Sequence, residues 1–340
     1  MDEKDYTGQS DKEFQNESIV YSANKDMNQP LDSEKITLLR ESAERGDAIA
    51  QYKLGCYYVE GETIKHSSLE EAIRWWRKAA EQGLVEAQEK IAHEYYIGYG
   101  VPKSIHEAVK WWHKAAEQGN ANAEYELGCC FMNGEVVSQS YYEAARWWQK
   151  AAEQGHIKAQ FNLGVCYEEG KGVEQSNSDA FKYYYKAAEQ GHVAAQYNVG
   201  VFYFNGKGVT KSLKEAVQWW RKAAGKGFTN AQFNLGLCYK EGAGVEVSLP
   251  EAKKWLRVAS LKGHKKAAKV LSAIRKSKAE ESIKLDDNKL IKKKNGGANN
   301  YDPQTVEQYK ESYAQDEMGY SDDDIDTIFD GNPLAYWNID

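Results

Sequence analysis

The chain has 340 residues, a formal net charge of −7, and charged side chains at 28% of its positions. Proline is scarce while alanine, glutamate and lysine are plentiful, a mixture that favours helix over sheet. The net acidity gives no reason to expect a nucleic acid or an anionic membrane as a partner. Membrane insertion is not expected either, because no stretch approaches the roughly 18 consecutive apolar residues of a membrane helix.

Residues 1–32 are polar and show little apolar periodicity, so we predict that they are disordered. They lack the charged start and the apolar core of a secretory signal, which makes the cytoplasm the expected location. The next segment, residues 33–46, reads SEKITLLRESAERG and predicts a single helix that caps the start of a larger array.

Glycines then recur with a period of 36 residues. One set closes a Glu-Gln-Gly tripeptide, or a variant with Lys in place of Gln, and comprises Gly83, Gly119, Gly155, Gly191, Gly227 and Gly263. A second set comprises Gly128, Gly164, Gly200 and Gly236, and a third comprises Gly98, Gly134, Gly170, Gly206 and Gly242. A fixed period of this length is the signature of a repeat architecture. It predicts six units, at residues 47–83, 84–119, 120–155, 156–191, 192–227 and 228–263.

Each unit reads as two helices. In the fourth unit, Ala159, Leu163 and Tyr167 share one face of a helix over residues 157–169, and a second helix follows from residue 177 to 190. One helical hairpin cannot bury its apolar face alone, whereas a stack of hairpins forms a continuous core. We therefore predict an all-α, right-handed α/α superhelical solenoid over residues 33–278, which ends in a basic helix from residue 264.

The motifs within each unit identify a resemblance. Examples are Ala-Gln-Phe-Asn-Leu-Gly at residues 231–236 and Glu-Ala-Val-Gln-Trp-Trp-Arg-Lys-Ala-Ala at residues 215–224. Such motifs are closely similar to the Sel-1-like repeat family, a relative of the tetratricopeptide repeat, over about residues 47–263. Two units depart from the pattern: the fourth has Tyr183-Tyr184-Tyr185 in place of a Trp pair, and the second has Ile91-Ala92-His93 in place of Leu-Gly.

The resemblance implies a function in protein binding, because members of the family act as adaptors and scaffolds for protein complexes. It also implies that the first helix of each unit lines a concave groove, which three columns of residues would face. The first column is Tyr52, Tyr125, Phe161, Tyr197 and Phe233; the second is Cys56, Cys129, Val165, Val201 and Leu237; the third is Val59, Met132, Glu168, Phe204 and Lys240. An apolar, aromatic groove suits an extended peptide or an amphipathic helix.

The first column has a second interpretation, because an aromatic residue at every unit is also what packing within the array requires. The third column varies more between units, and variable positions on a repeated frame are where specificity resides. Met132, Phe204 and Lys240 are therefore the preferred contact candidates.

The Trp pairs and the cysteines are interpreted as structural. We expect the second Trp of each pair to be buried and the first to be half exposed between adjacent repeats; the pairs are Trp75-Trp76, Trp111-Trp112, Trp147-Trp148 and Trp219-Trp220. The five cysteines show no disulfide framework and are expected to be reduced and partly buried. Some secreted bacterial relatives carry a disulfide in each repeat, and this chain lacks the second cysteine of that pair.

The sequence contains no recognised catalytic motif. A phosphate-binding loop, a nucleophile elbow and a zinc-protease motif are all absent from the sequence, and no Cys/His cluster has zinc spacing, so we expect no cofactor, no metal and no enzymatic activity. His156, His192 and His264 share one repeat position, which marks them as structural or capping residues, while His93 with Glu94 is the one candidate reactive pair. Besides a protein-binding adaptor, the alternatives are an immunity or inhibitor protein and, less favoured, a lactamase-like hydrolase.

The C-terminal region separates its charges. Residues 279–300 form a basic linker that we predict to be flexible, and residues 301–340 form an acidic tail in which Lys310 is the only base. The tail could form short helices and dock on a protein through Ile325, Ile328, Phe329, Tyr336 and Trp337. The alternative is a tail that serves only solubility.

Overall fold

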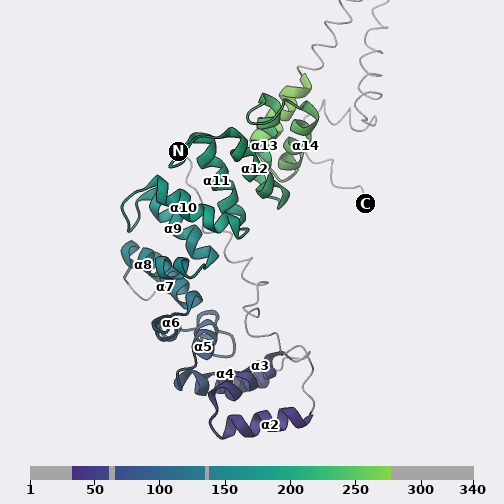
Figure 1. Cartoon of the computed structure of the whole chain (residues 1–340). Helices are drawn as coiled ribbons and strands as arrows, with labels where there is room; N and C mark the ends of the chain where they lie inside the picture. The colour runs from purple at the N-terminus through teal and green to yellow at the C-terminus, as the bar shows by residue number, and fades with distance from the viewer. Residues whose placement is uncertain (1–32, 61–65, 135–137, 277–340) are drawn as a thin grey trace, which may run out of the picture. The chain divides into compact units, whose positions relative to one another are not determined.

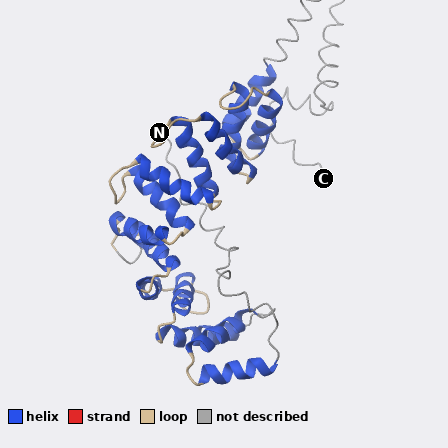
Figure 2. Cartoon of the chain, in the orientation of Figure 1, coloured by secondary structure: helices blue, strands red, loops and turns tan. Residues whose placement is uncertain are grey.

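A computed structural model describes residues 33–60, 66–134 and 138–276 of the chain (Figure 1). Within these ranges every regular element is an α-helix (Figure 2). The helices are α2 (Ser33–Glu44), α3 (Ala48–Glu60), α4 (His66–Glu81), α5 (Val85–Ile97), α6 (Ile105–Glu117), α7 (Ala121–Asn133), α8 (Tyr141–Glu153), α9 (Ile157–Glu169), α10 (Asn177–Glu189), α11 (Val193–Asn205), α12 (Leu213–Gly225), α13 (Thr229–Glu241) and α14 (Leu249–Leu261). Residues 265–276 are also helical.

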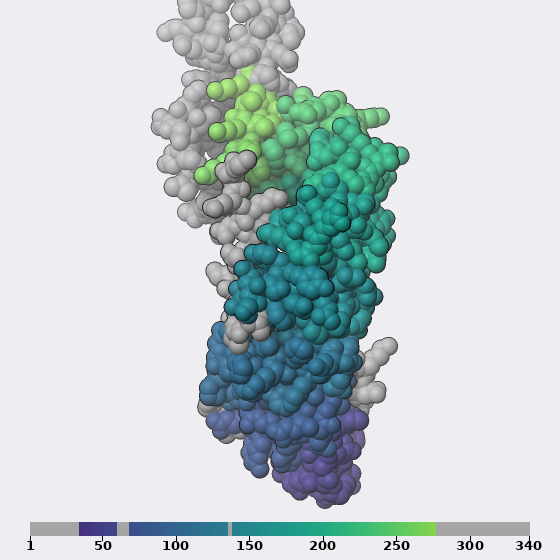
Figure 3. All heavy atoms as spheres, turned by 90° about the vertical axis from the view of Figure 1, so that its left-hand side faces the viewer, coloured from purple at the N-terminus to yellow at the C-terminus, as the bar shows by residue number. Residues whose placement is uncertain are grey.

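The helices form hairpins that stack in chain order, as the repeat period predicts. We call the first helix of each hairpin helix A (α3, α5, α7, α9, α11 and α13) and the second helix B (α4 to α14, even numbers), with α2 as a lone helix B at the start. Each helix packs most extensively on the helices that precede and follow it in the chain. In the space-filling view, successive repeats contact one another directly (Figure 3). The chain divides into two units at Lys269, and the first unit holds all six repeats.

Serine caps start helix B in five successive repeats, from α6 to α14. In each, the Ser Oγ accepts a hydrogen bond from the backbone N–H of the acidic residue three positions later, as with Ser104 and Glu107 at 3.3 Å and Ser140 and Glu143 at 3.2 Å. This Ser-x-x-acid pattern satisfies a backbone donor that lacks a helical partner and places a negative charge at the positive end of the helix.

A glycine of helix A and an aromatic ring of helix B form the core of most repeats. A Cβ atom added at Gly128, Gly164 or Gly200 would overlap the ring of Trp148, Tyr184 or Trp220, respectively, so the close approach of the two helices requires glycine there. The buried Trp also fixes the register of the hairpin, because its Nε1 donates to a helix A carbonyl: Trp148 to Tyr125 O at 3.1 Å, and Trp220 to Tyr197 O at 3.2 Å.

The expected burial of the second Trp is confirmed, but the expected half exposure of the first Trp is wrong. Both are buried, since Trp147 is 7% exposed and Trp148 is 3% exposed. The first ring is covered from two sides. The rings of Trp147 and His113, which belongs to the preceding repeat, are nearly perpendicular with 5.4 Å between their centroids, and the Lys150 ammonium lies 4.1 Å from the centroid of the Trp147 ring. The same lysine contact recurs with Trp75, Trp111 and Trp219.

Glutamines join most of the helices B to the following repeat. The buried Gln88 of helix A donates to Ala80 O at the end of the preceding helix B, 3.1 Å away. Gln118, which belongs to the Glu-Gln-Gly tripeptide, donates both to Gln88 Oε1 at 2.8 Å and to Gly83 O at 3.1 Å. The recurring tripeptide therefore supplies the side chain that satisfies a buried amide oxygen and ties consecutive repeats together.

Candidate protein-binding surface

The first predicted column lies at the junctions between repeats. Each aromatic side chain is half-buried and packs on the residue that precedes the next helix A. The ring centroids are 4.6 Å apart for Tyr125 and His156, 4.5 Å for Phe161 and His192, 5.0 Å for Tyr197 and Phe228, and 4.3 Å for Phe233 and His264. These rings therefore serve packing along the stack, which is the second of the two interpretations made from the sequence.

The shared histidines are helix caps. His156 and His192 accept a hydrogen bond at Nδ1 from the backbone N–H three residues later, at 3.1 and 3.2 Å, and His264 does the same at 3.1 Å. Burial lowers the pKa of His156 and of His192 to about 4, and it also lowers the pKa of His264. The rings are therefore neutral at pH 7, as the capping bond requires, and the prediction of a capping role is confirmed.

The second repeat replaces the aromatic stack with polar bonds. Glu89 stands in the first column there, and its carboxylate accepts hydrogen bonds from Asn120 at 2.6 Å and from Asn122 at 2.8 Å. Asn120 caps the next helix A. The contact between the first-column residue and the next cap is therefore kept in this repeat, but it is made by polar groups instead of aromatic rings.

The second column is half-buried throughout and includes two of the cysteines, Cys56 and Cys129. Cys130, Cys166 and Cys238 are buried one position further along helix A, and none of the five cysteines forms a disulfide in the structure. Burial raises the pKa of Cys166 to about 12 and that of Cys238 to about 11, so these two thiols are unreactive at neutral pH. Two cysteines are thus partly buried, as expected, and three are fully buried, while the reduced state stays a prediction.

In the third column, some side chains are bound to other residues of the array and others are accessible to a partner. Glu168 accepts a hydrogen bond from Tyr184 Oη at 2.7 Å and pairs with Lys207 Nζ at 3.0 Å, a consequence of the Tyr that replaces Trp in this repeat. Met132 is half-buried, whereas Phe204 is 36% exposed and Lys240 is exposed. Phe204 is held at its inner side by Trp220, with 5.4 Å between ring centroids.

A cluster of ionisable groups, which the sequence did not reveal, lies on the helices A of the second, third and fourth repeats. Burial raises the pKa of Glu126 to about 7. The charges of His93 and Lys158 lower this pKa, and the charge of Glu89 raises it. The other helices A have Lys53, Lys90 or an Asn at this position, so an acid at this one position was the only available signal.

The candidate reactive pair of His93 and Glu94 does not form a hydrogen bond. Glu94 is 4% exposed, and its Oε1 lies 3.8 Å from His93 Nδ1 and 3.6 Å from Lys90 Nζ. Within the described ranges, no three His, Cys, Asp or Glu side chains are grouped so as to hold a metal ion. No helix of the described residues is long and apolar enough to cross a membrane. The tail residues Ile325, Ile328, Phe329, Tyr336 and Trp337 lie outside the described residues.

Stacked helical hairpins, a fixed core and variable exposed positions on helix A define this chain as an α/α solenoid of the tetratricopeptide-like class. The model of the Sel1 repeat matches residues 48–84, 85–120, 121–156, 157–192, 193–228 and 229–264. The chain belongs to the Sel1 repeat family, whose members generally serve as protein-interaction scaffolds and whose solenoid is typically non-enzymatic. The resemblance found in the sequence is thereby confirmed.

Solved structures of Sel1 repeat proteins have the same fold as this chain. A protective antigen of uropathogenic Escherichia coli with an SLR fold is 33% identical, with a TM-score of 0.67; the match covers 72% of this chain and 52% of the antigen. A Sel1 repeat protein of Oxalobacter formigenes is also 33% identical, with a TM-score of 0.56, and the match covers 66% of this chain and 90% of that protein.

A shorter match is found with a plant protein. An F-box protein of Arabidopsis thaliana is 37% identical over 57 residues, which are 17% of this chain and 15% of that protein. The chain thus spans about half the length of the E. coli antigen and a small part of the plant protein.

Proposed function

We propose that this protein is a scaffold that binds another protein or peptide through the helices A of its last repeats, and that it acts by binding rather than by catalysis. The observation that carries the proposal is Phe204, a large aromatic side chain that is 36% exposed near the end of α11. Because its inner side rests on the buried Trp220, the ring is held in place before any partner arrives. Rigid aromatic anchors of this kind dominate the affinity of protein interfaces.

Charged groups beside Phe204 would select the partner. The Lys211 ammonium lies 5.9 Å from the centroid of the Phe204 ring. Lys207, in the same turn after α11, forms an ion pair with Glu168 of the preceding repeat. One repeat further on, the exposed Lys240 occupies the column position of Phe204. An aromatic centre with a polar rim is the usual anatomy of a protein interface.

Site-specific photocrosslinking tests the proposal. A photoreactive phenylalanine analogue replaces Phe204 in the full chain, and the control replaces Tyr142, which is 66% exposed at the start of α8 on helix B. We expect crosslinked partner proteins from the analogue at position 204 and few or none from position 142. Equal yields from both positions, or a yield from position 142 alone, would remove helix A as the binding surface.

We further infer a reducing location such as the cytoplasm, supported by five cysteines that form no disulfide, three of them buried. Protein isolated under conditions that trap thiols should react with five equivalents of a thiol reagent after unfolding. A disulfide in the isolated protein would contradict this location.

A further inference from the structure

The overall charge of −7 conceals a strong segregation of charge along the repeats. Residues 33–210 contain 19 Lys and Arg against 24 Asp and Glu, a formal net charge of −5. Residues 211–269, which contain the last two helices B, contain 13 bases against 4 acids, a formal net charge of +9. An exclusion of anionic partners that rests on the net charge therefore does not hold for the last repeats.

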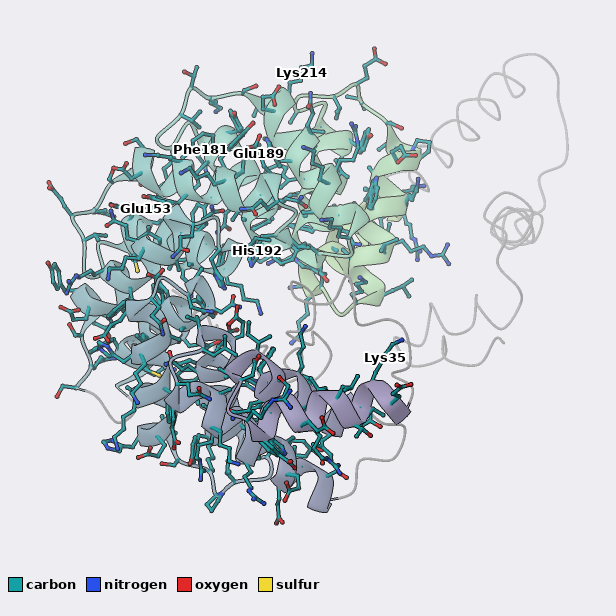
Figure 4. The ribbon with its side chains drawn as sticks, turned by 60° about the horizontal axis from the view of Figure 1, so that its bottom comes forward. Lys35, Glu153, Phe181, Glu189, His192 and Lys214 are labelled. Carbon is teal, nitrogen blue, oxygen red and sulfur yellow. The ribbon has the colours of Figure 1, made fainter. Side chains whose placement is uncertain are left out.

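Much of this change falls on one edge of the stack, where each helix B ends and the next helix A begins. Glu153 and Glu189 (labelled in Figure 4) are exposed at the last positions of α8 and α10. The corresponding residues of α12 and α14 are uncharged, Gly225 and Leu261. The next position, glutamine at the four earlier junctions, is lysine at the last two. We call Lys226, Lys262, Lys265 and Lys266 the basic edge.

The four lysines of the basic edge are exposed. Lys226 Nζ donates to the backbone carbonyl of Gly191 and Lys262 Nζ to that of Gly227, both at 2.8 Å. Over residues 33–60, 66–134 and 138–276, no carboxylate lies within ion-pair distance of any of the four. The positive charge is thus available to a partner.

The lysines leave a defect in the buried structure. At three of the four earlier junctions a glutamine amide satisfies the buried Oε1 of the helix A glutamine, as Gln190 does for Gln160 at 2.8 Å, and at the other Gln154 donates to the Glu124 carboxylate. Lysine reaches only the glycine carbonyl, and the buried Oε1 atoms of Gln196 and Gln232 are left without a hydrogen-bond partner. A buried acceptor without a partner lowers the stability of the folded protein. The lysines at these two junctions therefore add surface charge at a cost in stability.

The surroundings of the basic edge indicate the chemistry of the partner. Leu261, 64% exposed, lies beside Lys262 and offers an apolar contact among the charges. The rings at this edge already pack on other rings, since His264 stacks on Phe233 and Phe228 is tilted against Tyr197, so they do not offer the free faces on which nucleic acid bases stack. We propose that the basic edge binds an acidic polypeptide segment with apolar side chains between its carboxylates.

This surface is separate from Phe204 and adds a second binding site to the proposed scaffold. Residues 301–340 of the same sequence have the required chemistry, with 11 acids, Lys310 as the only base, and Ile325 and Phe329 close to Asp322–Asp324. A peptide of this sequence is therefore a suitable probe of the basic edge.

The test measures fluorescence anisotropy of labelled peptide 301–340 with the full-length protein at low ionic strength. In the variant K226Q/K262Q/K265T/K266N each lysine becomes a residue that other repeats carry at that position, such as Gln118, Thr229 and Asn230. We expect the variant to bind about tenfold or more weakly, and added salt to weaken binding to the native protein. The control K53Q/K103Q/K110Q/K182Q removes the same charge from earlier repeats and should stay within about twofold of the native protein.

Several results would overturn the proposal. Equal weakening by the variant and the control would show attraction to overall charge alone. Because the acids of the chain could compete with the probe, the experiment is repeated on D322N/D323N/D324N/D326N; no binding by either this protein or the native one would exclude the site. Tighter binding of a DNA oligonucleotide of equal charge, lost in the lysine variant, would assign the edge to nucleic acid instead.

Discussion

The junctions after the first four repeats differ from the junctions after the last two, although the frame around them is the same. In the early group, a glutamine amide donates to a buried side-chain oxygen of helix A, which belongs to glutamine at three junctions and to Glu124 at the fourth. Gln118 and Gln190 also bridge to a glycine carbonyl of the previous junction. In the late group, Lys226 and Lys262 keep the bridge but leave the buried oxygens of Gln196 and Gln232 unpaired. At this one position of the repeat, glutamine favours stability and lysine favours positive surface charge, while the arrangement of the helices is the same.

The largest effect should come from breaking the frame that both groups share. The substitutions G128A and G200A would each place a Cβ against a buried Trp ring, and we expect each to lower the free energy of unfolding by about 1–3 kcal/mol. Equal losses in urea unfolding would show that the early and late repeats have the same core. The control is G225A, where an added Cβ meets nothing within 4 Å and should not destabilise.

The histidine caps should make the middle of the stack sensitive to acid. The pKa values of about 4 for His156 and His192 lie below the ordinary 6.5, so the unfolded chain binds more protons between these values. Stability therefore falls as the pH drops from about 6.5 to about 4, by about 1 kcal/mol per histidine between pH 7 and 5 after allowance for partial exposure.

The variant H156N/H192N keeps a capping oxygen, as Asn120 provides in the third repeat, and removes the titration. Its unfolding midpoint should vary less with pH than that of the native protein, as followed by circular dichroism from pH 4 to 8. The same pH dependence in both proteins would refute the capping mechanism.

Glu126 should act in the opposite direction. Its pKa of about 7 lies above the ordinary 4.5, so its charged form is disfavoured in the folded state and stability falls as the pH rises from about 4.5 to about 7. E126N introduces the residue found at Asn162 and should stabilise the protein by about 1 kcal/mol at pH 8, with no gain at pH 4. Thermal unfolding at the two pH values checks this, and an equal gain at both would point to packing instead.

The sequence was sufficient for the fold because the period is visible in several glycine sets at once. The predicted helix at residues 157–169 is found as α9, Ile157–Glu169. The error on the first Trp has a physical reason: periodicity within a hairpin identifies its inner face, but His113, which covers Trp147, comes from the preceding repeat.

The candidate site was less predictable for a similar reason. A recurring aromatic at Phe161 fits both a groove and a junction, and the choice depends on His192, which lies 31 residues later in the chain and stacks on the ring. Glu126 is an ordinary surface acid in the sequence, and only the packed neighbours give it a raised pKa. The overall charge of −7 is a sum over segments of opposite sign, so it did not reveal the positive charge of residues 211–269.

The opposite substitution, lysine for glutamine at an early junction, should reproduce the loss of stability. Q118K and Q190K should each leave a buried oxygen, that of Gln88 or Gln160, without its partner and lower the free energy of unfolding by up to about 1 kcal/mol. Urea unfolding of the single variants measures the loss. Unchanged stability in both would mean that lysine at a junction carries no penalty.

The most direct test is the variant K226Q/K262Q, measured in urea unfolding and in binding of peptide 301–340. The account predicts a higher unfolding midpoint, from a gain of about 1 kcal/mol at each junction as Gln196 and Gln232 acquire partners, together with weaker peptide binding. An unchanged or lower midpoint with undiminished binding would contradict the claim that the last junctions exchange stability for charge.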